Sequence, residues 1–249
     1  MKIEKMNTPK QRVLVTGAAG GMGQALVRLL VQQGTTVIGL DHNSARLTTL
    51  ADELQDGGFV PLNLDLADDQ LPRVLEATLA QNGGLTGVVN LAGISCGDSI
   101  DQLEDSDWNT SLEVNVTAPM RISRIAIRFM PENAGGSIVN VGSPVGMIGA
   151  RKPSYAASKG ALHGLTMSLA RNLGPRGIRA NLLLPGTCLT PMTRDWSKEK
   201  VAQVSQGSFL KRLCRPEEVA AVIVFLLSPS ASYITGSVID MTAGGLWGH

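Results

Sequence analysis

Residues 13–23 read VLVTGAAGGMG, a short apolar run that leads directly into a glycine-rich loop. Apolar residues then recur with helical periodicity over positions 24–33. A buried strand, a glycine turn and a helix in this order are typical of a βαβ unit, in which helices pack on a parallel sheet. This stretch therefore predicts an α/β fold.

The same alternation of strand and helix patterns continues along the chain. Short aliphatic or β-branched runs occupy residues 13–16, 36–40, 60–64, 88–91, 137–141, 179–184 and 238–241. Helical periodicity occupies residues 24–33, 45–54, 69–81, 108–128, 155–173 and 217–227. Strands alternating with helices of this length indicate a parallel sheet that is covered on both faces. Because no linker or repeat interrupts the pattern, we expect one domain over residues 1–249.

Composition narrows the class of protein. Of 249 residues, 43% are hydrophobic and 17% charged, and a formal net charge of +1 gives no reason to expect nucleic acid or membrane partners. Cys96, Cys188 and Cys214 have no metal-ligand spacing, so we predict no metal site and free thiols in a reducing compartment. Residues 1–11 form a polar N-terminal extension, and the most apolar stretch, 219–227, is too short to span a bilayer. We therefore expect a cytoplasmic protein.

The glycine-rich loop is the first candidate binding site. Glycine allows positive φ and close approach of a ligand to the backbone, and the N-terminus of the next helix favours a pyrophosphate. The spacing of the loop glycines differs from the common dinucleotide fingerprint, so the loop alone also fits an ordinary strand-to-helix turn. The loop residues to which we assign cofactor contacts are Gly17, Gly20, Gly21, Met22 and Gly23.

Acidic residues follow the second and third predicted strands. A carboxylate at Asp41 can accept both ribose hydroxyls of an adenosine and would repel a 2′-phosphate. Because no arginine occupies the loop and His42 follows Asp41, NAD is favoured over NADP. Asp65 can meet the adenine. The alternatives are a helix-capping aspartate at the first position and a surface loop aspartate at the second.

Tyr155 and Lys159 lie four positions apart, on one face of a predicted helix. An adjacent ammonium stabilises a phenolate and lowers the pKa of the tyrosine, which can then exchange a proton with a substrate oxygen near neutral pH. The pair is common by chance, and Lys159 alone also fits a solvated helix lysine.

Together with later motifs, these features resemble the short-chain dehydrogenase/reductase family over about residues 12–245. Each motif is weak alone, whereas their order and spacing are specific. The sequence departs from the family at Leu91, where a second asparagine is common, and at 241–245, which lack the usual acidic residue. The motifs are Thr16–Gly23, Asn90-Leu91-Ala92-Gly93, Asn115-Val116-Thr117-Ala118-Pro119, Ser143, Tyr155–Lys159, Pro185-Gly186, Thr190-Pro191-Met192, Arg215–Ala220 and Tyr233-Ile234-Thr235-Gly236.

The resemblance implies a Rossmann-type fold, a doubly wound parallel sheet with helices on both faces, and a catalytic tetrad of Asn115, Ser143, Tyr155 and Lys159. Ser143 would stabilise the substrate oxygen, Tyr155 would be the general acid or base, and Lys159 would hold the nicotinamide ribose and lower the pKa of Tyr155. Asn115 would break its helix and position a water that relays protons to Lys159. Taken alone, Ser143 also fits a turn serine and Asn115 a local hydrogen-bonding residue.

The resemblance also implies a larger cofactor site and a homotetramer formed through residues 108–128 and 155–173. Thr190 would contact the nicotinamide carboxamide. The further cofactor contacts are Leu66, Asn90, Ala92, Gly93, Tyr155, Lys159, Pro185, Gly186, Leu189 and Thr190.

Candidate substrate contacts surround the tetrad. Residues 187–213 are expected to form a mobile lid that excludes water on closure. Met192 and Trp196 also fit residues that anchor the lid, and Cys96 fits a small apolar filler. The assigned substrate contacts are Ser95, Cys96, Val145, Met192 and Trp196.

Three functions fit the sequence. The first is an NAD(H)-dependent oxidoreductase of secondary alcohols or ketones, with oxidation favoured because Asp41 selects NAD. The second is a 3-oxoacyl thioester (acyl carrier protein) reductase that uses NADPH, against which Asp41 argues. The third, of another class, is a catalytically idle nucleotide-binding regulator, against which the intact tetrad argues.

Overall fold

A computed structural model describes residues 11–55, 57–131, 135–190, 193 and 195–246. Its centre is a seven-stranded parallel sheet with the spatial order β3-β2-β1-β4-β5-β6-β7. The order reverses between β1 and β4, and ligands of such sheets bind beyond the carboxyl ends of the strands at this point. The strands are β1 (Arg12–Thr16), β2 (Thr36–Asp41), β3 (Phe59–Asn63), β4 (Gly87–Asn90), β5 (Gly136–Val141), β6 (Ile178–Pro185) and β7 (Val238–Met241).

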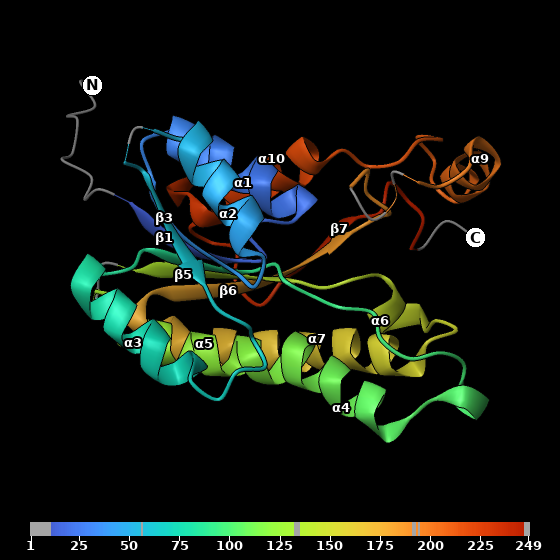
Figure 1. Ribbon diagram of the computed structural model, residues 1–249, viewed down its shortest axis with the longest axis horizontal. Coiled ribbons are helices and arrows are strands. Elements are labelled where there is room, and N and C mark those ends of the chain that lie inside the picture. The colour runs from blue at the N-terminus through green and yellow to red at the C-terminus, as the bar shows by residue number, and fades with distance from the viewer. Residues whose placement is uncertain (1–10, 56, 132–134, 191–192, 194, 247–249) are drawn as a thin grey trace.

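Helices cover both faces of the sheet, which confirms the predicted doubly wound fold (Figure 1). One face carries α1 (Gly21–Gln32), α2 (Ser44–Glu53) and α10 (Pro216–Leu227). The other carries α3 (Leu71–Asn82), α4 (Asp105–Leu112), α5 (Ala118–Ala126) and α7 (Pro153–Leu173). Two further helices, α6 (Val145–Ile148) and α9 (Lys198–Gln206), lie toward one end of the molecule. The remaining turns are η1 (Ile100–Gln102), η2 (Glu113–Thr117), η3 (Gly174–Arg176) and η4 (Pro229–Ala231).

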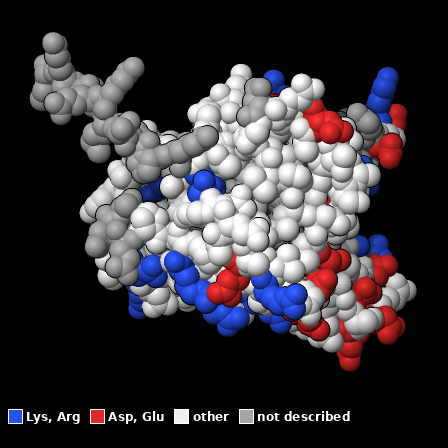
Figure 2. Space-filling model, turned by 60° about the vertical axis from the view of Figure 1, so that its left-hand side comes forward, with Lys and Arg blue, Asp and Glu red and all other residues white. Residues whose placement is uncertain are grey.

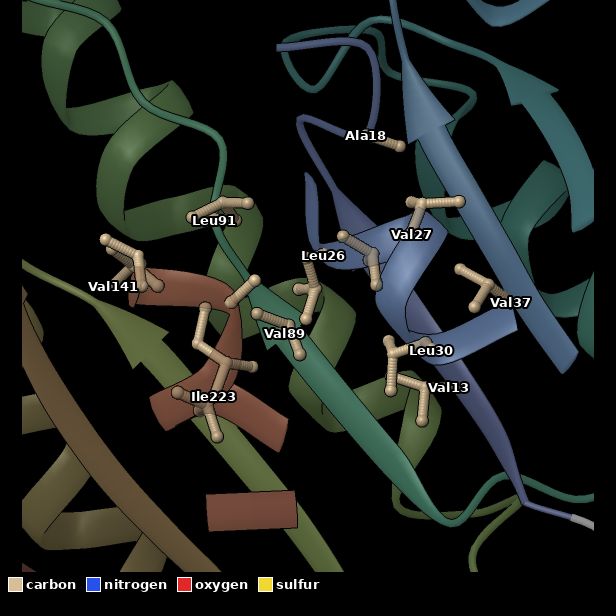
Figure 3. Packing of buried hydrophobic residues seen from close by; sticks show 14 of the residues in the cluster. Val13, Ala18, Leu26, Val27, Leu30, Val37, Val89, Leu91, Val141 and Ile223 are labelled. Carbon is tan, nitrogen blue, oxygen red and sulfur yellow. The ribbon is translucent and has the colours of Figure 1, made fainter. Parts of the chain in front are cut away.

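Successive strand residues point to opposite faces, so each strand feeds two hydrophobic layers. Val13 and Val15 pack in one layer with Leu26 of α1 and Ile223 of α10 (Figure 3). Leu14, between them, packs in the other layer with residues of α3 and α5. Burial on both faces explains why the strands read as nearly continuous apolar runs rather than as alternating ones.

The observed elements agree with the predicted ranges to within a few residues, with one exception. The helix predicted over residues 108–128 is not continuous, because the π-helical turn η2 separates α4 from α5. This turn contains Asn115, the residue at which the family resemblance implies a break. The sequence pattern also gives no indication of α6 or α9. Both are short and neither has the long apolar stripe that makes a helix recognisable.

The surface combines both charge signs. In the view of Figure 2, Lys and Arg side chains gather along the lower edge, and Asp and Glu side chains adjoin them. One pair in the fold, Arg128 and Glu76, is joined by a 3.0 Å salt bridge. Of the helices in the described part of the chain, none has the length and apolar character needed to cross a bilayer.

The turn from β1 into α1 depends on a close backbone contact at Gly23. A Cβ atom on Gly23 would lie 2.0 Å from the carbonyl oxygen of Gly17. Gly17 itself has a φ of +69°, and a Cβ there would lie 2.9 Å from the Cα of Ala92. The turn therefore packs backbone against backbone and places the start of α1 beside the loop that follows β4.

Gly23→Ala is expected to destabilise the fold by roughly 1–3 kcal/mol, because the added methyl group forces the turn apart. Gly207→Ala is a matched control, since a Cβ there meets its nearest neighbour at 3.4 Å, an ordinary contact. Chemical denaturation of both variants measures the difference. Equal stability of the two variants would contradict the role given to Gly23.

Candidate active site

A cleft of about 540 Å³ opens at the switch point between β1 and β4. It runs from the glycine loop along the ends of β2 and β3 to the loop after β4. Its lining residues are Gly17, Ala19, Gly20, Gly21, Met22, Gly23, Leu40, Asp41, His42, Asn43, Arg46, Leu64, Asp65, Leu66, Ala67, Leu91, Ala92, Gly93, Ile94, Thr110, Val114 and Thr190.

One end of the cleft suits a diphosphate. Helix α1 begins at Gly21, and its N-cap residue Gly20 has no side chain to satisfy the free N–H groups of the first turn. No acidic residue lies in that first turn, so the positive end of the helix dipole faces the cleft without a competing carboxylate. The residues present therefore fit the diphosphate of a dinucleotide.

Asp41 lies at the next part of the cleft, 8% exposed. One carboxylate oxygen accepts a hydrogen bond from the Ala19 amide at 3.0 Å, and the other accepts one from the Asn43 amide at 2.9 Å. Each oxygen keeps further lone-pair capacity toward the cleft. Arg46 also lines this part, so a carboxylate and a guanidinium border the same space.

The loop after β4 is fixed to the glycine loop by Thr16. Its hydroxyl accepts hydrogen bonds from the amides of Leu91 and Ala92, both at 3.1 Å. The two walls of the cleft are therefore joined at its base.

Asn115 lies in the π-helical turn η2 and is fully buried. Its side chain accepts a 2.9 Å hydrogen bond from the amide of Ile94 and donates one of 2.9 Å to the carbonyl of the same residue. It also donates to the Ser158 hydroxyl at 2.9 Å. Asn115 therefore connects the loop after β4 to helix α7, which carries Tyr155 and Lys159.

Lys159 is only 4% exposed. Its ammonium donates to the Val141 carbonyl at 2.9 Å and lies 5.9 Å from the centre of the Tyr155 ring. Loss of hydration lowers the pKa of Lys159 to about 8. The side chain is thus held between the end of β5 and the tyrosine, as the spacing of the two residues in the sequence predicts.

The pKa of Tyr155 differs from the sequence-based expectation. Burial raises this pKa above its ordinary value, and a hydrogen bond with the side chain of Ser143 only partly offsets the effect. The expected lowering by Lys159 is not found, because the loss of phenolate hydration dominates and Lys159 does not contribute to the shift. Its ammonium lies 5.9 Å from the ring centre. Tyr155 is therefore a protonated phenol at neutral pH.

Ser143 reaches Tyr155 because α6 docks closely on α7. A Cβ on Gly146 would lie 2.6 Å from the backbone carbon of Lys159 and 2.7 Å from the amide nitrogen of Gly160. This contact between backbones fixes the turn that carries Ser143. The sequence does not indicate this docking of Gly146 on α7, because a glycine three residues after a serine gives no signal by itself.

Several of the predicted cofactor residues do not line the cleft. Asn90 donates at 2.8 Å to Asn140 inside the sheet, Gly186 lines a second cavity, and Leu189 donates its amide to the Cys214 carbonyl. The predicted cofactor residues that do line the cleft are Gly17, Gly20, Gly21, Met22, Gly23, Asp41, Asp65, Leu66, Ala92, Gly93 and Thr190. Those that do not are Asn90, Tyr155, Lys159, Pro185, Gly186 and Leu189.

Four of the predicted substrate residues, Ser95, Cys96, Val145 and Trp196, are described by the structure, and they line neither described cavity. The carbonyls of Ser95 and Cys96 accept hydrogen bonds from Lys152 at 3.2 Å and from Ser154 at 2.8 Å. Val145 begins α6. Two further assignments lie in the proposed lid. The Trp196 ring lies 4.3 Å from the ammonium of Lys200, a contact within its own segment, and Met192 lies outside the described residues.

A second cavity of about 440 Å³ begins beside the tetrad, at Pro144 and Gly186. Residues around α9, which belong to the segment 187–213 expected to form the lid, and residues at the end of β7 complete it. No local motif indicates that these two segments converge, because they do so only in the folded chain. Its lining residues are Pro144, Ile148, Gly186, Thr187, Val204, Gly207, Ser208, Leu210, Arg212, Leu213, Cys214, Glu218, Asp240, Met241, Thr242, Ala243 and Gly245.

Sequence reasoning also missed three cleft residues, Thr110 on α4, Val114 in η2 and Arg46 on α2. Thr110 and Val114 lie four positions apart, a helical spacing that places them on one face next to Asn115. Arg46 lies in the first turn of α2, five positions after Asp41. The helical spacing of Thr110 and Val114 can be recognised in the sequence, whereas the position of Arg46 in the cleft depends on how α2 turns away from β2.

Comparisons with known proteins agree with this geometry. A family model described as "Enoyl-(Acyl carrier protein) reductase" matches residues 17–245. Similar curated proteins include 3-oxoacyl-[acyl-carrier-protein] reductases of Vibrio harveyi, 34% identical over 96% of this chain and 98% of the relative, and of Thermotoga maritima, 36% identical over 93% and 96%.

Two solved structures have the same fold, each with a TM-score of 0.88 and 30% identity over 95% of this chain. One is a short-chain dehydrogenase/reductase of Brucella melitensis named for glucose/ribitol dehydrogenase, of which 96% is covered. The other is a mutant short-chain dehydrogenase/reductase of Serratia marcescens, of which 98% is covered.

The burial of Lys159 predicts a pH-dependent stability. Below pH 8 both the folded and unfolded states hold the proton, and the folded state bears the full desolvation cost. Between pH 8 and 10.5 the unfolded state binds more protons, so the contribution of Lys159 to the free energy of unfolding rises with pH. Lys159→Met is therefore expected to stabilise the fold at pH 7 by roughly 2 kcal/mol, the desolvation cost less one hydrogen bond.

Urea unfolding at pH 7 and pH 9 measures this effect, and the gain should shrink at the higher pH. Lys198→Met, at an exposed position of α9, is the control and should change stability little. A destabilised Lys159→Met protein at both pH values would mean that the bond to Val141 outweighs the cost of burial.

Proposed function

The chain belongs to the short-chain dehydrogenase/reductase family, and from that premise we propose that it reduces the keto group of a 3-oxoacyl thioester with NADH. The observation that carries the proposal is the Ser143–Tyr155–Lys159 arrangement, held next to a cleft that fits a dinucleotide. A nicotinamide dinucleotide supplies the hydride when it is bound, and the chain supplies binding, orientation and the proton.

The site can supply the proton that reduction needs. Reduction of a ketone requires a proton donor at the carbonyl oxygen, and Tyr155, whose ordinary pKa near 10 is raised further by burial, is a phenol at neutral pH. Ser143 would donate a second hydrogen bond to the same oxygen and stabilise its developing charge. Lys159, charged below about pH 8, would favour the phenolate that remains after the proton has left.

The proposed substrate class differs from the one that the sequence alone favours. Oxidation of a secondary alcohol comes first on the sequence alone, because Asp41 selects NAD. The curated relatives named above are instead 3-oxoacyl-[acyl-carrier-protein] reductases. The second cavity supports a substrate with an acyl chain, since it begins beside Ser143 and the exposed apolar residues Ile148 and Leu210 border it.

A secondary alcohol dehydrogenase is the second candidate. It is supported by the structural neighbour named for glucose/ribitol dehydrogenase and by the carboxylate of Asp41 in the cleft. For either candidate we also propose the homotetramer and the cytoplasmic location that the sequence predicts.

Cofactor binding without turnover of either substrate class would support an idle nucleotide-binding regulator instead.

The cofactor preference rests on Asp41. Asp41→Asn removes the charge that repels a 2′-phosphate and keeps one acceptor for the loop. The ratio of NADPH to NADH dissociation constants is expected to fall about tenfold or more, corresponding to roughly 1.4 kcal/mol. Fluorescence titration with both cofactors measures it. Asp65→Asn, elsewhere in the same cleft, is the control. An unchanged ratio would place the discrimination at Arg46 rather than at Asp41.

The role of Tyr155 is tested with acetoacetyl-coenzyme A and NADH. Tyr155→Phe is expected to lower turnover about 100-fold or more, because it removes the hydroxyl that carries the transferable proton, and to leave the dissociation constant for NADH within about twofold. Tyr233→Phe is the matched control, since Tyr233 is the second of two tyrosines and is fully exposed. Retained turnover in the Tyr155→Phe enzyme would remove Tyr155 as the acid. Wild-type turnover of secondary alcohols alone would favour the second candidate.

A further inference from the structure

Two cysteines meet where the segment that carries α9 leaves and rejoins the body of the protein. Cys188 follows β6 and Cys214 precedes α10, and the two residues pair in a parallel β-bridge. The Leu189 amide donates to the Cys214 carbonyl at 2.8 Å, and the Cys214 amide donates to the Thr187 carbonyl at 2.9 Å. Paired strands lie about 4.8 Å apart, and a disulfide spans Cα separations of about 4.4–6.8 Å.

The two thiols lie close enough that each shifts the pKa of the other, and both side chains belong to the hydrophobic layer between the sheet and α10. The Cys214 thiol also donates to the Arg215 carbonyl at 3.5 Å. Cys188 is buried, whereas Cys214 is half-buried and lines the second cavity. The third cysteine, Cys96, lies in the loop after β4. The backbone pairing and the side-chain contact therefore select one pair out of three thiols.

We propose that Cys188 and Cys214 form a reversible disulfide with a low-molecular-weight disulfide as the oxidant. The Cys214 thiolate attacks one sulfur of the small disulfide and expels one small thiol, which leaves a mixed disulfide on Cys214. Cys188 then gives up its proton and attacks the Cys214 sulfur, which releases the second small thiol. Two protein thiols are oxidised, and one small disulfide is reduced to two thiols.

The environments of the two thiols support this order of attack. A hydrogen bond from Cys188 lowers the pKa of Cys214, and the same bond, together with burial, raises the pKa of Cys188. The thiolate is the nucleophile in such exchange, so the accessible cysteine with the lowered pKa reacts first. Cys188 is already in contact with it and resolves the mixed disulfide.

The bond would close the chain from residue 188 to residue 214 into a loop. This loop contains α9 and residues 204–213, which form one wall of the second cavity. A cross-link restricts the unfolded chain more than the folded one, so the oxidised protein should resist heat better. Within a reducing compartment such a disulfide forms only transiently, as is usual for redox-sensing pairs.

The test treats the full-length native protein with oxidised glutathione and follows it by mass spectrometry. The expected result is a loss of two hydrogen masses, a peptide map that links Cys188 to Cys214, and reversal by dithiothreitol. The melting temperature should rise by several degrees on oxidation and return on reduction. None of these readouts depends on the proposed enzymatic function.

Variants separate the two cysteines from the third. Cys96→Ser should still form the link, whereas Cys214→Ser and Cys188→Ala should not. Cys188 is buried, so the assignment does not depend on a variant at that position alone. Alkylation of the wild-type protein before and after oxidation also shows which thiols form the link. Stable glutathione adducts on Cys214, links that involve Cys96, links between chains, or no reaction at all would each overturn the proposal.

Discussion

The whole cleft depends on one steric constraint, the contact of Gly23 with the carbonyl of Gly17. Because Gly23 has no side chain, α1 can start directly at the end of β1, with its N-terminal amides facing the switch point of the sheet. Gly17 also packs closely against Ala92, so the loop after β4 is brought to the same place. The hydroxyl of Thr16 then fixes the two loops together.

The candidate catalytic residues include a buried charge, the ammonium of Lys159, whose burial lowers the free energy of unfolding. Lys159 has exchanged water for one carbonyl and the face of a tyrosine, which explains its lowered pKa. Two packing devices hold it there. Asn115 bonds to the loop after β4 and to Ser158 of α7, and Gly146 lets α6 dock on the backbone of α7. Stability is thus given up at the site where proton transfer is needed.

Cofactor choice depends on competing charges in one part of the cleft. Asp41 is anchored by two backbone amides, so its carboxylate cannot turn away from a bound ribose without breaking them. Arg46 lines the same space and would attract the phosphate that Asp41 repels. Because two backbone amides fix the carboxylate of Asp41 in place, its charge favours NADH as the cofactor.

The sequence by itself determined the alternation of strands and helices, the glycine turn and the pairing of Tyr155 with Lys159, because these follow from local periodicity and spacing. It could not determine features that depend on segments far apart in the chain. The position of Arg46, the docking of Gly146 on α7 and the contact of Cys188 with Cys214 arise only when the sheet brings distant loops together. The raised pKa of Tyr155 belongs with them, since burial is a property of the folded protein and spacing alone predicts the opposite sign.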